Sequence, residues 1–223
     1  MRPASWLFVL LGLTAMAAAV QPCRIEVVEQ GDGWPVPGVE LRTVHGVRFV
    51  SDNAGLIACD LPELMGRETW FTVSGHGYGV KADGFGYAGV RLTPTPGQTL
   101  KVTVARTILA RRLGRLTGAG LFAESQKLGE QLDWQESGVL GADSVVTAEH
   151  AGRLHWFWGD TNLAHHPLGI FNVSAATTEG FTPPERPPLR PPYTYFTKPD
   201  TKHRERRPVG VAEVPGDGPT WLW

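Results

Sequence analysis

The stretch that decides the fold is PVPGVELRTVHGVRFVSDNAGL, residues 35–56. Within it, apolar and polar residues alternate along Val39-Glu-Leu-Arg-Thr-Val44 and Val47-Arg-Phe-Val50. Alternation with a period of two is typical of strands that bury one face. Asp52-Asn53 and Gly55 tolerate the left-handed backbone of a hairpin turn. The stretch therefore predicts short strands separated by tight turns.

The same pattern continues on both sides of this stretch. Gly, Pro, Asn and Asp separate further alternating runs, which cover residues 24–28, 56–58, 70–73, 89–92 and 100–104. Seven short strands at this spacing, with no convincing helix between them, are typical of an antiparallel β-sandwich. We therefore expect a β-sandwich over residues 22–106.

The order of the turn residues is more specific than the strand pattern. Pro35-Val-Pro37-Gly38, Ser51-Asp52-Asn53-Ala54-Gly55, Leu61-Pro62 and Gly75-His-Gly77-Tyr78 follow one another along the chain. In this order they resemble the prealbumin-like sandwiches known as carboxypeptidase-regulatory-like domains. The resemblance implies a spacer or binding module attached to another part, without chemistry of its own.

The chain begins with a pattern typical of a secretory signal peptide. One positive charge precedes an apolar run from Trp6 to Ala15, and Ala17-Ala-Ala19 supplies a small-residue cleavage site before Val20. The apolar run is shorter than the about 20 residues that a transmembrane helix needs. Residues 1–19 are therefore predicted to be a signal peptide, and the protein is expected to be secreted or periplasmic, with no membrane association after cleavage.

The two cysteines of the chain are Cys23 and Cys59. In an oxidising compartment they can form a disulfide, which would stabilise the fold by about 3 kcal/mol. The alternative is a pair of unbonded thiols buried in a core, and the distance between the two residues decides between these interpretations.

The second half of the chain contains a predicted hairpin. Apolar runs at 144–148 and 154–158 flank the turn His150-Ala-Gly152, and the second run is apolar on both faces. A strand of this kind is expected to be buried on both sides. Such a hairpin is how a propeller blade begins.

Ala142-Asp143-Ser-Val-Val146 with Gly152-Arg-Leu-His-Trp156-Phe-Trp158 resembles the first blade of five-bladed arabinofuranosidase- and xylosidase-type glycosidases, although Ser144 stands where that family prefers proline. The resemblance implies that Asp143 is a general base or a sugar-positioning carboxylate. The layout, with Gly159-Asp160-Thr161, is also similar to uncharacterised exported bacterial proteins.

Hydrolysis of a glycoside normally needs two carboxylates. Asp160 is the second catalytic candidate, and Trp156, Trp158 and Thr161 are the candidates for substrate binding, because carboxylates beside aromatic residues are typical of sugar sites. The alternative is that each aspartate hydrogen-bonds nearby backbone amides in a turn.

A propeller needs about four to eight blades, and residues 138–223 hold at most one. Residues 107–137 are expected to connect this partial blade to the sandwich. Eight prolines between Thr182 and Pro208 predict an extended, mobile insertion over residues 182–208. The chain ends at 219–223 within what looks like a strand, so a truncated protein is expected. The predicted fold class is mainly β: an antiparallel β-sandwich plus an incomplete propeller-like segment with a Pro-rich loop.

The charge composition of the chain bears on which kinds of ligand it can bind. The net charge is −1, which gives no basic excess for nucleic acid. Adjacent residues His165-His166 point to opposite faces of an extended chain, so no metal site and no cofactor are predicted. Carbohydrate or polysaccharide is the expected partner, and the oligomeric state is left open.

Two functions remain at this point. The chain is either the N-terminal part of an exported glycoside hydrolase-like protein, catalytically incomplete as it stands, or an extracellular carbohydrate- or protein-binding sandwich without catalysis.

Overall fold

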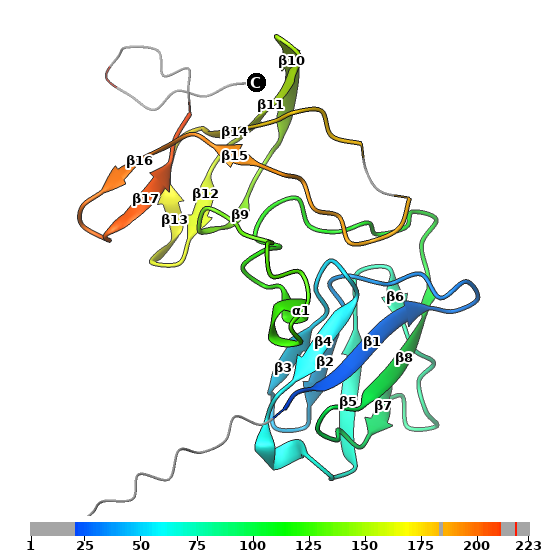
Figure 1. Cartoon of the computed structure of the whole chain (residues 1–223). Helices are drawn as coiled ribbons and strands as arrows, with labels where there is room; N and C mark the ends of the chain where they lie inside the picture. Colours follow the sequence, from blue (N-terminus) through cyan, green and yellow to red (C-terminus); the bar gives the residue numbers. More distant parts are fainter. Residues whose placement is uncertain (1–20, 183–184, 211–216, 218–223) are drawn as a thin grey trace, which may run out of the picture.

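The computed structural model describes residues 21–182, 185–210 and 217 of the chain (Figure 1). The predicted signal peptide at 1–19 and the strand predicted at 219–223 lie outside these residues. The described chain is mainly β, as the sequence predicted. Across this described part, no helix has the length and apolar character needed to cross a membrane.

The first part is a sandwich of two four-stranded sheets, ordered β4-β1-β8-β6 and β3-β2-β5-β7. The first sheet consists of β1 (Cys23–Glu29), β4 (Leu56–Cys59), β6 (Tyr78–Gly79) and β8 (Thr99–Arg106). The second consists of β2 (Glu40–Thr43), β3 (Arg48–Val50), β5 (Thr69–Ser74) and β7 (Gly89–Leu92). All seven predicted strands are present, and β6 and a 3-10 turn at Pro62–Leu64 are added to them.

The sandwich is held together by the alternation that predicted it. Every second residue of β1 is buried, beginning with Cys23 and ending with Glu29. The side chains of Cys23, Ile25 and Val27 meet Leu41 and Phe71 from the other sheet in one apolar core. Burial of such side chains is the main favourable term in folding, at about 1.5–3 kcal/mol for each large residue.

One strand pair departs from the antiparallel prediction. β1 pairs with β8 in parallel, from Arg24 opposite Thr99 to Glu29 opposite Val104. The other strand pairs of both sheets are antiparallel. The first and last long strands of the sandwich therefore lie side by side.

The connecting segment folds back onto the sandwich (Figure 1). Its helix α1 (Glu124–Lys127) lies against the turn of the sandwich that precedes β4. Asp52 Oδ2 accepts a hydrogen bond from the Ser125 N–H at 2.8 Å. Asn53 donates to the carbonyls of Arg115 and Leu189, and its Oδ1 accepts from the Arg115 N–H. The turn at Asp52–Gly55, which the sequence predicted only as a hairpin turn, thus also binds the connecting segment.

The second part contains a four-stranded antiparallel sheet, ordered β10-β11-β14-β15. Its strands are β10 (Val146–His150), β11 (Arg153–Trp158), β14 (Ser174–Thr178) and β15 (Thr194–Tyr195). The predicted hairpin is confirmed as β10 and β11, joined at Ala151 and Gly152. A propeller blade also has four strands. Here, however, the chain leaves the sheet after β11 and returns only at β14.

Two smaller sheets lie beside this one. The first has the order β13-β12-β9 and the second pairs β16 with β17. Their bounds are β9 (Val139–Ala142), β12 (Thr161–Leu163), β13 (His166–Ile170), β16 (Thr197–Asp200) and β17 (Glu205–Pro208). Three short strands, β15, β16 and β17, lie inside the predicted Pro-rich insertion at 182–208, so part of this extended segment takes part in two sheets.

Candidate functional site

Asp143 and Asp160, the two predicted catalytic carboxylates, lie next to each other. Asp143 follows β9 and Asp160 precedes β12, and these strands pair antiparallel. The Asp143 N–H donates to the Asp160 carbonyl at 3.0 Å, and the Asp143 carbonyl accepts from Gly159 at 3.1 Å. The structure thus brings together two residues that are 17 positions apart in the sequence.

The environments of the two carboxylates differ. Asp143 is exposed, whereas Asp160 is half-buried. Within the described chain, Asp160 Oδ1 is buried without a hydrogen-bond partner. This desolvation raises the pKa of Asp160, and the negative charge of Asp143 raises it further. A pair of acids whose environments differ in this way is the arrangement that general acid–base chemistry uses.

Trp156, Trp158 and Thr161 are placed inside the second part rather than at a surface. Trp156 is 6% exposed and Trp158 is 3% exposed, and both pack against Tyr193. Thr161 is fully buried, and its hydroxyl lies 2.8 Å from that of Ser174. The substrate-binding assignment is corrected accordingly: in this structure these side chains form the core and do not face a ligand.

Cys23 and Cys59 lie opposite each other on β1 and β4. Both are fully buried and unbonded in this structure. Residues paired across antiparallel strands have Cα atoms about 4.5–5.5 Å apart, which is within the range that a disulfide spans. The fold therefore satisfies the spacing condition that the sequence left open.

A cluster of aromatic side chains lies on the outer face of the second sheet of the sandwich. Trp70 of β5 borders a hollow of about 450 Å³ together with Phe85 and Tyr87 from the loop before β7. Phe85 is 88% exposed and Tyr87 is 65% exposed. Val44, Asp83 and Arg91 complete the lining. We refer to these six residues as the aromatic hollow.

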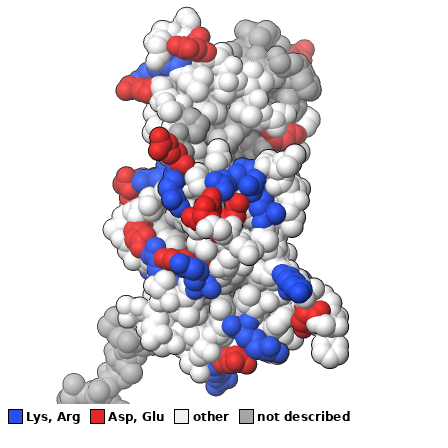
Figure 2. Space-filling model, turned by 90° about the vertical axis from the view of Figure 1, so that its right-hand side faces the viewer, with Lys and Arg blue, Asp and Glu red and all other residues white. Residues whose placement is uncertain are grey.

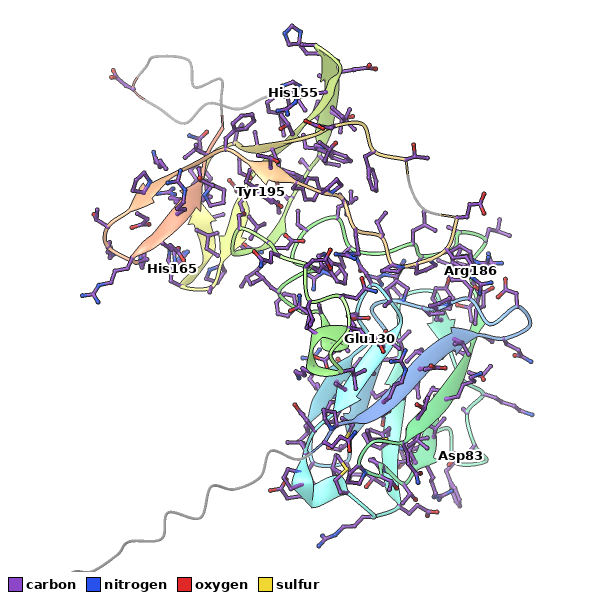
Figure 3. All side chains as sticks on the ribbon, viewed as in Figure 1. Asp83, Glu130, His155, His165, Arg186 and Tyr195 are labelled. Atoms are coloured by element: carbon purple, nitrogen blue, oxygen red, sulfur yellow. The ribbon has the colours of Figure 1, made fainter. Side chains whose placement is uncertain are left out.

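The loop that carries Phe85 and Tyr87 is held by its own hydrogen bonds. Asp83 Oδ1 accepts from the N–H groups of Phe85 and Tyr87 at 2.9 and 3.0 Å. The backbone of Asp83 and Tyr87 is also bonded across the loop. Asp83 lies at the end of the sandwich remote from the second part (Figure 3). The aromatic side chains are thus presented by a structured turn and not by an irregular loop.

Trp70 is fixed from both sides. It lies opposite Arg91 on β7, whose guanidinium carbon is 5.5 Å from the indole centroid. Gly89 leaves room for the ring, because a Cβ there would lie 2.4 Å from a Trp70 ring carbon. A cation over an indole face is a favourable arrangement. The position of the Trp70 ring in the aromatic hollow is therefore set by its packing against β7.

A second hollow, of about 500 Å³, lies between the sandwich and the connecting segment. Its charged lining is largely paired: Lys127 Nζ is 3.2 Å from Glu124 and 3.4 Å from Asp60. Burial raises the pKa of Glu124, and this effect outweighs the opposing effect of Lys127. These groups already have partners, so this hollow offers a ligand fewer free contacts than the aromatic hollow does.

Sequence reasoning missed the aromatic hollow. Phe85 lies between Gly84 and Gly86, and Tyr87 follows Gly86, in the segment between the strands predicted at 70–73 and 89–92. Large aromatic residues alternating with glycine in a predicted loop have no core to enter, and this is the signal that identifies them.

Charged side chains of both signs are interleaved on the face shown in Figure 2, with no large surface of one sign.

Comparisons of the chain with protein-family models, with the curated proteins and with the solved structures found no match.

Proposed function

We propose that this protein binds carbohydrate outside the cytoplasm, through the aromatic hollow of its sandwich. The observation that carries the proposal is the grouping of Trp70, Phe85 and Tyr87 around one hollow, with two of the rings largely exposed on a hydrogen-bonded loop. Exposed apolar surface of this kind marks binding sites in soluble proteins.

The lining suits a sugar ring. The C–H face of a pyranose packs against an aromatic face, while its hydroxyls need polar partners at the rim. Arg91 supplies donors there. Both turn-forming hydrogen bonds of Asp83 use Oδ1, so Oδ2 is available to accept from a hydroxyl. The mixture of rings and two charged rim residues favours a glycan over a purely apolar ligand.

The proposal is tested on a glycan array, followed by calorimetric titration with the best-retained glycan. Phe85→Ala and Tyr87→Ala should each weaken binding by about tenfold or more, which corresponds to about 1.4 kcal/mol. Leu132→Ala is the matched control, because Leu132 is 68% exposed but lies outside the hollow. Retention of no glycan, or equal affinity for all three variants, would overturn the proposal.

A second candidate, glycoside hydrolysis, is favoured by the Asp143–Asp160 pair. In this mechanism Asp160, with its raised pKa, would protonate the leaving oxygen, and the exposed Asp143 would activate water. Release of reducing sugar from an unactivated oligosaccharide, whose leaving oxygen needs protonation, should then fall about 10²–10⁴-fold in Asp160→Asn and in Asp143→Asn. The rate should also decline as the pH rises through the pKa of Asp160. Turnover that is absent, or unchanged in both variants, would exclude this function.

A further inference from the structure

Two hairpin tips of the second part meet and bring three metal-ligating side chains together. His165 stands in the turn between β12 and β13, while His203 stands in the turn between β16 and β17 and Glu205 begins β17. One potential ligand atom from each of these three residues lies within 4.8 Å of the others. Figure 3 shows His165 at this end of the molecule, far from Asp83 and the aromatic hollow.

The contacts within this group are close. The two imidazole rings have centroids 3.6 Å apart and are almost parallel, at 8°. His165 Nδ1 lies 3.6 Å from Glu205 Oε1, which is longer than a hydrogen bond, so this carboxylate is not committed to the ring. Both side chains are partly exposed, at 28% and 42%, so an ion can reach them from solvent.

His203 is held in place by a fourth residue. Its Nδ1 lies 3.0 Å from Asp200 Oδ2, and Asp200 Oδ1 accepts from the backbone N–H groups of Lys202 and His203. Asp200 is only 14% exposed. A carboxylate that accepts from one ring nitrogen of a histidine fixes the ring and leaves the other nitrogen to a metal. His203 Nε2 is therefore the ligand atom that this arrangement presents.

We propose that His165, His203 and Glu205 form a binding site for a divalent transition-metal ion, with Zn²⁺ as the best fit, and that Asp200 is its positioning residue. Two imidazoles and one carboxylate are a ligand set that Zn²⁺ uses, with the fourth position left open. Ca²⁺ and Mg²⁺ prefer oxygen ligands, so two nitrogens argue against them.

Binding requires a small local rearrangement. Tetrahedral ligands around Zn²⁺ lie about 3.3 Å apart, so the ligand atoms, which lie within 4.8 Å of one another, must approach by at most about 1.5 Å. A ring nitrogen binds an ion in the plane of its ring, so the stacked His165 ring must turn away from that of His203. His165 can do this because it stands in an exposed two-residue turn.

His166 does not take part. Its Nδ1 accepts from the Leu168 N–H at 2.9 Å. The histidine that lies beside His165 is instead His203, 38 residues further along the chain.

The test uses the full secreted chain without a polyhistidine tag, stripped with a chelator and titrated with Zn²⁺ against a chromophoric indicator. The native chain should bind one Zn²⁺ with a dissociation constant below about 10 µM. His165→Ala and His203→Ala should each weaken binding at least tenfold, and Asp200→Asn by about 10–100-fold. His76→Ala is the matched control, because His76 is exposed on the sandwich.

Folding of each variant is checked by circular dichroism, and Glu205→Gln provides a conservative variant if an alanine variant unfolds. Loss of binding in His203→Ala also excludes the thiols of Cys23 and Cys59 as the ligands, since both remain in that variant. Co²⁺ should show weak d–d absorption without thiolate bands. An affinity weaker than about 10 µM, or the same affinity in native and His203→Ala chains, would overturn the site.

Discussion

Replacing Asn53 with alanine should loosen the attachment of the connecting segment to the sandwich. The Asn53 side chain is 1% exposed and makes three hydrogen bonds of 2.8–3.0 Å, two with the backbone of Arg115 and one with the carbonyl of Leu189. Each such bond contributes about 1 kcal/mol, and the backbone groups left behind have no replacement partner in alanine. The expected loss in the free energy of unfolding is therefore about 3 kcal/mol.

The assay has two readouts. In a chain of this size, a loss of about 3 kcal/mol lowers the melting temperature by about 6–12 °C. Trypsin should also cut after Arg115 several times faster, because Asn53 holds that residue's N–H and carbonyl. Asn162→Ala is the control, since Asn162 is exposed on β12 and its loss should change stability by less than about 0.5 kcal/mol. If Asn53→Ala melts within about 2 °C of the native chain and is cut at the same rate, the docking role assigned to Asn53 is wrong.

Three further predictions concern the sandwich. Gly55→Ala should destabilise the fold by more than about 2 kcal/mol in urea denaturation, because Gly55 has a φ of +73° and an added Cβ would lie 2.9 Å from the Val36 nitrogen. The control is Gly84→Ala, which should not destabilise the fold in this way, because an added Cβ at Gly84 would lie in open space. Burial raises the pKa of Glu29, but hydrogen bonds from Arg111 and Arg106 outweigh this effect and leave the pKa below its ordinary value. The ionised Glu29 side chain therefore stabilises the fold above pH 4.5, and this stabilisation is lost as the pH falls through the lowered pKa. The stability difference between native and Glu29→Gln chains should accordingly shrink between pH 6 and pH 3, and an unchanged difference would contradict this. Burial raises the pKa of Cys59 to about 11, so iodoacetamide should label it in the reduced chain only after unfolding, as mass spectrometry would show.

The sandwich could be predicted because its information is local. Alternating apolar residues specify which face of each strand is buried, and Gly55 specifies its turn. Which strands become neighbours is decided by packing between distant segments. The parallel pairing of β1 with β8 therefore has no counterpart in any short stretch of sequence.

The short strands within the Pro-rich region were not predicted, for a related reason. Proline cannot donate to a sheet, and its density predicted an extended loop. Pro199 and Pro208 nevertheless lie in β16 and β17. These two strands form a sheet of only two, in which each strand has a free edge where a missing N–H costs nothing.

For the candidate sites, the sequence identified the types of residue involved more reliably than it predicted their burial and their neighbours in space. The run at 154–158 correctly predicted the strand β11, but only one face of this strand is buried, and that face carries Trp156 and Trp158, whose burial is incompatible with sugar binding. Asp143 and Asp160 were identified by type, and the pairing of β9 with β12 brings them together. His203 and Glu205 meet His165 only through the contact between two hairpins, which no spacing in the sequence reveals.

The parallel pairing of β1 and β8 also has a mechanical consequence. A force that pulls the chain apart at the start of β1 and the end of β8 acts along both strands, in opposite directions. The six paired positions from Arg24 to Glu29 then resist together in shear, instead of opening one after another like a zip. The same geometry that closes the sandwich therefore gives it resistance to a force applied between the start of β1 and the end of β8.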